Sequence, residues 1–205
     1  MRRRWLVVVV GVLLAVGIVA VGAVAGQRLM ERKTPPAAAP EASEPAEPST
    51  SNPGEFVEFR HEPLGLAISY PANWSVIPRP NDPQVLLLAS GSPNESFLLR
   101  AIPLGVAIPP EKVPEMKQLT DQLVTSGAGV KLLTEPQQIE LAGLPGYYYL
   151  YSFPDPQTGQ TGAHAHYFLA KGDHLIVLVF EAKPAEEFPR LAPLFDRIAE
   201  SLRVL

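Results

Sequence analysis

The sequence predicts an α+β domain, an antiparallel β-sheet with flanking α-helices, preceded by one transmembrane helix and a disordered linker. Three observations lead to this prediction. An uncharged apolar run occupies residues 5–26, and a Pro/Ala/Glu-rich stretch follows it. The rest of the sequence consists of short apolar runs separated by turn residues, which predict strands, and of two segments in which apolar residues recur at helical spacing. We expect residues 1–27 to form the anchor, residues 28–54 the linker and residues 55–205 the folded domain.

The N-terminal apolar run is long enough to cross a bilayer. It contains thirteen Val, Leu and Ile residues and no charged residue, and about 20 apolar residues span a bilayer core. The short N-terminal arm with Arg2, Arg3 and Arg4 fits the cytoplasmic side. A cleaved signal peptide stays open, because Ala23-Val24-Ala25 has the pattern of a cleavage site. Both interpretations place the domain outside the cytoplasm, and the uncleaved anchor places it at the cell membrane.

The linker is composed almost entirely of Pro, Ala, Glu, Ser and Thr from residue 34 to residue 54, with no aromatic residue. Such a composition cannot bury enough apolar surface to offset the entropy of ordering. We therefore expect a flexible spacer, extended where its prolines cluster.

The folded part should be a run of antiparallel strands with one helix inserted and one helix at the end. The apolar stretch 175–180 predicts a central strand covered on both faces. Since strands are grouped rather than alternating with helices, an antiparallel sheet is favoured over βαβ units. The expected strands are 56–60, 64–70, 74–77, 85–90, 97–104, 130–133, 137–141, 147–153, 163–170 and 175–180, with a turn at 143–146.

Two segments change to helical period. Between Pro110 and Gly127 the apolar residues recur at helical spacing, and they are Val113, Met116, Leu119 and Leu123. The second segment runs from Phe188 to Leu202 with its apolar residues on one face. Pro189 and Pro193 should keep its regular part from beginning much before residue 190.

Charge and composition exclude several classes of function. Residues 55–205 contain eleven Lys/Arg and seventeen Asp/Glu, a net charge of −6, so we expect no nucleic-acid partner. The chain has no cysteine, which removes disulfides, thiolate catalysis and cysteine-based metal sites. We expect no cofactor.

At the segment Leu64–Pro71, followed by Trp74, the sequence resembles the opening strand, Pro turn and Trp of the PsbP-like family. The segment Ile139–Tyr151 resembles the family's mid-domain strand, and the similarity extends over nearly all of residues 56–205. The resemblance implies an antiparallel sheet flanked by helices. It also implies a binding or assembly role rather than catalysis, since photosynthetic members are extrinsic subunits of the oxygen-evolving photosystem. The N-terminal anchor departs from that photosynthetic type.

His164 and His166 form the candidate metal site. On a strand both side chains project from one face, as two metal ligands would. The alternative is an exposed strand face with two ordinary histidines, which would titrate between pH 5 and 8.

Tyr147, Tyr149 and Tyr151 are candidate binding residues, because successive residues of a strand alternate between its faces and tyrosine is favoured at interfaces. Ordinary cross-strand pairing is the alternative. Asp155 begins a polar loop that would serve either as a recognition tip or as a solvated turn.

Standard catalytic motifs are missing from the sequence, among them G-x-S-x-G, the P-loop and H-E-x-x-H. We therefore expect no enzyme, and predict a membrane-tethered extracytoplasmic binding or assembly module with a protein partner at the cell envelope. Two alternatives stay open: a metal-binding domain that uses the His-x-His pair, and a hydrolase with an unrecognised site.

Overall fold

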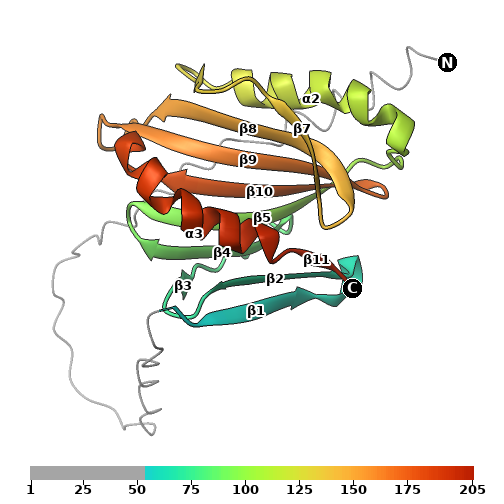
Figure 1. The fold of residues 1–205 in the computed structure, drawn as a ribbon, viewed down its shortest axis with the longest axis horizontal. Helices are drawn as coiled ribbons and strands as arrows, with labels where there is room; N and C mark the ends of the chain where they lie inside the picture. Colours follow the sequence, from blue (N-terminus) through green and yellow to red (C-terminus); the bar gives the residue numbers. More distant parts are fainter. Residues whose placement is uncertain (1–53) are drawn as a thin grey trace, which may run out of the picture.

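The computed structural model describes residues 54–205, which form two antiparallel sheets and two α-helices (Figure 1). The large sheet has the strand order β3-β4-β5-β10-β9-β8-β6, and β7 pairs with β8. Its strands are β3 (Ser75–Val76), β4 (Val85–Ser92), β5 (Glu95–Pro103), β6 (Lys131–Leu132), β7 (Gln137–Leu141), β8 (Leu144–Pro154), β9 (Thr161–Lys171) and β10 (His174–Ala182).

The small sheet joins the beginning of the domain to its end. Its order is β1 (Phe56–His61), β2 (Leu66–Pro71) and β11 (Arg203–Val204). The helices are α2 (Val113–Thr125) and α3 (Phe188–Glu200), and three 3-10 turns lie at Glu62–Leu64, Pro110–Lys112 and Ala185–Glu187. The expected order of strands, helix, strands and helix is confirmed.

Strand β10 is the central strand of the large sheet, as its uninterrupted apolar run predicts. It pairs with β5 on one side and β9 on the other, and most of its side chains are buried. A strand buried on both faces has no need of polar alternation.

Helix α3 and the small sheet cover one face of the large sheet. In Figure 1, α3 crosses in front of β10, β5 and β4. Its Phe195 packs on Phe180 with ring centroids 5.1 Å apart, and Phe180 stacks on Phe97 at the same distance. All three rings are buried in one continuous apolar cluster. Ser201 fixes the end of the helix to β2 by accepting a hydrogen bond from the Ser69 amide at 2.8 Å.

Helix α2 covers part of the opposite face. It packs over β8, where the Tyr149 hydroxyl lies 2.7 Å from Thr120 Oγ1 and donates to Asp121 Oδ1 at 2.8 Å. The buried stripe of the helix is Val113, Met116, Thr120 and Val124. The expected stripe of Val113, Met116, Leu119 and Leu123 is confirmed in its first half and displaced by one residue in its second half, where Leu119 and Leu123 are half-buried. The hydroxyl partner on β8 allows the polar Thr120 to be buried.

The turn before β8 lies earlier than predicted. Residues Ala142 and Gly143 both have positive φ angles, 54° and 75°, and form a two-residue connection between β7 and β8 of the kind hairpins favour. Gly146, expected in the turn, lies inside β8. An added Cβ there would lie 1.9 Å from the carbonyl oxygen of Phe168, so a side chain is excluded at this position.

Helix α3 begins at Phe188, with Pro189 in its first turn, where the missing amide donor costs nothing. This agrees with the start expected near residue 190. Within residues 54–205, none of the helices has the length and apolar character needed to cross a membrane. The predicted anchor and most of the predicted linker lie outside the described residues.

Candidate functional site

Four polar residues lie in register across the α2-side face of the large sheet. Ser96 on β5 is opposite Glu181 on β10, Glu181 is opposite His164 on β9, and His164 is opposite Tyr151 on β8. All four are buried. Strand periodicity places them on one face, and antiparallel pairing aligns them in one row.

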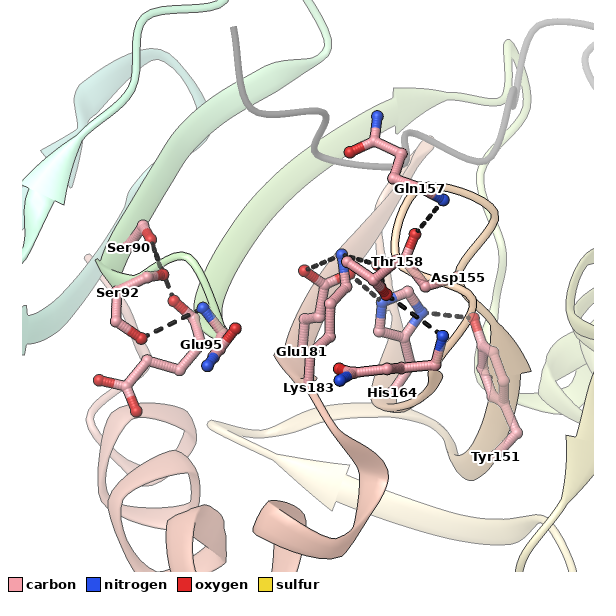
Figure 2. A network of polar contacts seen from close by, with 12 residues as sticks. Ser90, Ser92, Glu95, Tyr151, Asp155, Gln157, Thr158, His164, Glu181 and Lys183 are labelled. Carbon is pink, nitrogen blue, oxygen red and sulfur yellow. Dashed lines mark hydrogen bonds and ion pairs between the residues drawn. The ribbon is translucent and has the colours of Figure 1, made fainter. Parts of the chain in front are cut away.

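A chain of hydrogen bonds connects Tyr151, His164 and Glu181 of this row (Figure 2). His164 Nε2 lies 2.9 Å from Glu181 Oε2, and His164 Nδ1 lies 3.2 Å from the Tyr151 hydroxyl. The same hydroxyl lies 3.1 Å from His166 Nε2. One tyrosine hydroxyl thus bridges two histidines, while the chain does not reach the Ser96 side chain. His166 Nδ1 is buried and has no partner in the described structure.

Lys183 extends the network to the loop after β8. Its ammonium lies 3.2 Å from Glu181 Oε1 and 3.4 Å from Asp155 Oδ2. Asp155 also accepts hydrogen bonds from the Gln157 amide at 2.9 Å and the Thr158 hydroxyl at 3.1 Å. The carboxylate therefore holds the loop closed and faces inward, while the rest of the loop is exposed.

The environment fixes the charge of several of these groups. Burial by itself raises the pKa of Glu181, but the His164 hydrogen bond and the Lys183 ammonium outweigh it and hold the pKa below its ordinary 4.5. The Gln157 amide is the main reason why the pKa of Asp155 is lowered. Burial, aided by His164, holds the pKa of His166 well below 6.5, so this ring is neutral at physiological pH. Burial raises the pKa of Tyr151, which keeps its proton.

A pocket adjoins the row where α2 leaves the sheet uncovered. Its volume is about 160 Å³, and its lining is mainly apolar. The end of α2 and the loop after it form one wall, with Leu123, Val124 and Ala128, and the sheet forms the floor, with Leu98, Val177 and Val179. Polar residues also line this space, among them Arg100, Tyr151, His164, His166 and Glu181. A largely apolar pocket with a few converging polar groups is the usual form of a small-molecule site.

The predicted tyrosines do not form an exposed surface. Tyr147, Tyr149 and Tyr151 are all buried, because α2 and the pocket wall cover the face on which they lie. They face Phe168, His166 and His164 across β9, as ordinary cross-strand pairing predicts. Only Tyr151 lines the pocket. A binding role for the three residues and for the buried Asp155 stays a prediction.

The two predicted histidines share one face, with ring centroids 5.3 Å apart. The face is not exposed, and three of their four ring nitrogens already have protein partners. Across residues 54–205 there is no group of three or more His, Cys, Asp or Glu side chains placed to hold a metal ion. Metal binding by the pair stays a prediction, which metal titration of the protein and of His166→Ala would test.

Sequence patterns missed two charged residues of the site. Lys183 follows β10 directly, and Arg100 lies inside the apolar strand β5, where it forms an ion pair with Asp82. Both are buried. A lone basic residue at an inward position of an apolar strand predicts a buried ion pair, because a buried charge without a partner is strongly disfavoured.

The fold is that of PsbP, although no protein-family model and no curated protein matches the sequence. The structure is similar to cyanobacterial PsbP (CyanoP) from Synechocystis sp. PCC 6803, with a TM-score of 0.53 and 14% identity over 77% of this chain and 99% of that one.

Two further solved structures are similar. LpqN of Mycobacterium tuberculosis, described as involved in cell envelope biogenesis, aligns with a TM-score of 0.52 and 12% identity over 73% of this chain and 90% of that one. A protein from Bacteroides thetaiotaomicron aligns with a TM-score of 0.51 and 10% identity over 72% of this chain and 48% of that one. At such identities the comparisons show the fold alone, and they confirm the predicted antiparallel sheet with flanking helices.

Proposed function

We propose that this protein is a non-catalytic binding module, held at the outer face of the cell membrane by its N-terminal segment, where it takes up a partner of the cell envelope. The observation that carries the binding role is the pocket on the half-covered face of the large sheet. It combines an apolar lining with a buried polar network, which is the composition of a binding site.

The order of the polar row argues against hydrolysis. A serine nucleophile needs a histidine beside it, with the acid on the far side of that histidine. Here Glu181 lies between Ser96 and His164, so the histidine is engaged with the carboxylate and the tyrosine. The Ser96 hydroxyl thus has no neighbouring histidine in the row, which supports binding without catalysis.

The membrane location rests on the sequence. The apolar run 5–26 suits a bilayer span, and a 27-residue flexible linker has a mean reach of roughly 30 Å. A domain on such a tether could meet partners at or near the membrane surface. The fold neighbour LpqN is described as involved in cell envelope biogenesis, which is compatible with this location, although a shared fold does not by itself transfer function.

Fractionation of the native cell tests the location. The full-length chain should sediment with membranes and stay there after a high-salt wash, because an apolar span is not released by screening charges. Recovery of the intact chain in the soluble cytosolic fraction would contradict the tether.

Proximity labelling from the full-length chain tests the partner. We expect the same envelope protein in repeated experiments and its loss when the domain 55–205 is replaced by an unrelated domain on the same anchor. Identical labelling by the two chains would show that the anchor alone selects the neighbours, and would contradict a binding role for the domain.

A further inference from the structure

We propose that the pocket between α2 and the large sheet binds an uncharged apolar molecule about the size of a single aromatic ring. The ligand lies on Leu98 and Val179 and is enclosed by the end of α2. This inference rests on the binding function proposed above and names the chemical class of one ligand.

The accessible floor of the pocket is apolar. Leu98 on β5 lies opposite Val179 on β10 and, on its other side, opposite Leu88 on β4. Leu98 and Val179 are half-buried and line the pocket. Ser96 and Glu181 lie two residues away on the same strands and on the same face, but both are buried. A ligand that enters the pocket therefore rests chiefly on aliphatic side chains.

The two charged residues of the lining already have partners of opposite charge. Arg100 forms an ion pair with Asp82, and Glu181 lies 3.2 Å from the Lys183 ammonium and 2.9 Å from His164 Nε2. Arg100 is 7% exposed and Glu181 is 4% exposed. A charged ligand would lose its hydration in the pocket without gaining an unpaired counter-charge, which is strongly unfavourable. The site therefore disfavours anions and cations alike.

Buried polar atoms do not offer a ligand a hydrogen bond here. Among residues 54–205, Arg100 Nε and His166 Nδ1 have no hydrogen-bond partner, but both atoms are fully buried and a ligand in the pocket does not reach them. The Tyr151 hydroxyl already lies within hydrogen-bond distance of His164 and His166. Removal of apolar surface from water is therefore the main source of affinity.

The wall of the pocket is fixed to the sheet. It includes Leu123 and Val124 at the end of α2 and Val130 in the loop that follows. Gly129 of this loop lies so close to the end of β8 that an added Cβ would be 2.8 Å from Pro154 Cγ. Because the loop packs closely on β8, the wall is in place before a ligand enters, which lowers the entropic cost of binding.

The volume of the pocket sets the size of the ligand. A cavity of about 150 Å³ lined by aliphatic and aromatic residues stays dry when empty and holds one benzene ring. This pocket has about 160 Å³, and Phe153 and Phe168 add aromatic side chains to its lining. Toluene therefore matches the site in size and charge, whereas benzoate and benzylammonium match it in size alone.

Calorimetric titration of the full-length chain in nanodiscs of a zwitterionic lipid, with empty nanodiscs as the blank, tests the ligand class. The probes are toluene, benzoate and benzylamine at neutral pH, which share the ring and differ in charge. We expect toluene to bind at least about tenfold more tightly than either ion, because an ion is desolvated without a counter-charge. Equal or tighter binding of either ion, or no binding of toluene, would overturn the proposal.

A change of polarity on the floor tests where the ligand lies. Val179→Thr keeps the β-branched shape and places a hydroxyl on the floor, and it should weaken toluene binding about tenfold. Val57→Thr is the matched control, because Val57 is exposed on β1 of the small sheet, and it should bind toluene like the parent. Equal affinities of the two variants would remove the ligand from the floor and overturn the site.

A change of volume at the rim gives a second test. Ala128→Trp places a large side chain at the exposed edge of the pocket, where it need not disturb folding, and it should abolish toluene binding. Gln118→Trp, on the exposed side of α2, is the matched control and should bind like the parent. Undiminished binding by Ala128→Trp would place the ligand elsewhere and overturn the site.

These results are distinguishable from failure of the proposed function. Toluene binding with no reproducible envelope partner contradicts the partner alone. A labelled partner without toluene binding contradicts the ligand class alone.

Discussion

The two faces of the large sheet differ in what covers them and in what they contain. The α3 side is closed by a helix and a second sheet over an apolar cluster that includes Phe97, Phe180 and Phe195. The α2 side is covered only in part, and it holds Glu181, Lys183, Arg100 and two histidines. Both faces use the same strands, so strand pairing does not explain the difference.

The two faces should contribute differently to the stability of the domain. Apolar burial is the dominant stabilising contribution in a fold of this kind, and the α3 side supplies it with a cluster of buried apolar side chains. A buried ionic network is seldom the most stabilising choice. Its concentration beside the pocket is what the binding role proposed above would account for.

The largest expected effect is on the α3 side. Phe180→Ala should lower the free energy of unfolding by about 3 to 5 kcal/mol, because it opens a cavity between the rings of Phe97 and Phe195. Urea denaturation measures this. Phe153→Ala, which trims the pocket edge, should cost less than half as much. If the two variants lose the same free energy of unfolding, the α3 side is not the more stabilising of the two faces.

The buried network gives the next effect. Lys183→Met should cost roughly 3 kcal/mol, since it leaves Glu181 and Asp155 buried without a cation. Arg60→Met is the matched control, because Arg60 forms exposed ion pairs with Glu58 and Glu62 and should cost less than about 1 kcal/mol. If the two variants are equally stable, the buried network of Lys183, Glu181 and Asp155 does not stabilise the fold.

The pH dependence of stability should be smaller, and two groups of the α2 side contribute to it. Because burial holds the pKa of His166 below 6.5, the unfolded chain binds protons more readily, and the free energy of unfolding should fall as the pH drops below about 6.5. The lowered pKa of Glu181 adds a further loss below about pH 4.5. The contribution of His166 to stability is therefore complete above about pH 6.5, and that of Glu181 is complete above about pH 4.5.

Denaturation between pH 4 and 8 measures the profile. His166→Phe should flatten the part just below pH 6.5, and Glu181→Gln should flatten the more acidic part. A parent and a His166→Phe variant with parallel profiles would contradict the neutral state assigned to His166.

The smallest effect concerns the junction between α2 and β8. Tyr149→Phe should cost about 1 kcal/mol, since it removes the hydroxyl that bonds Thr120 and Asp121. Tyr147→Phe, on the same face of β8, is the control, because its hydroxyl makes no hydrogen bond to another side chain of residues 54–205. Thermal unfolding of both variants checks this, and equal midpoints would show that the hydroxyl contact does not hold the helix.

The sequence by itself determined the strand and helix order, the central place of β10 and the shared face of the two histidines. These follow from side-chain period and turn residues, which are local properties. The N-terminal anchor and linker are predicted from the same kind of local signal.

The tertiary structure alone decided which residues meet. Glu181, His164 and Tyr151 come from three strands, and their alignment depends on register, which no local pattern specifies. The burial of Asp155 and the tyrosines depended on where α2 lies and on the ammonium of Lys183. The pocket lies where α2, a helix of 13 residues, leaves part of the large sheet uncovered. Its presence therefore depends on how segments that are distant in the sequence pack together.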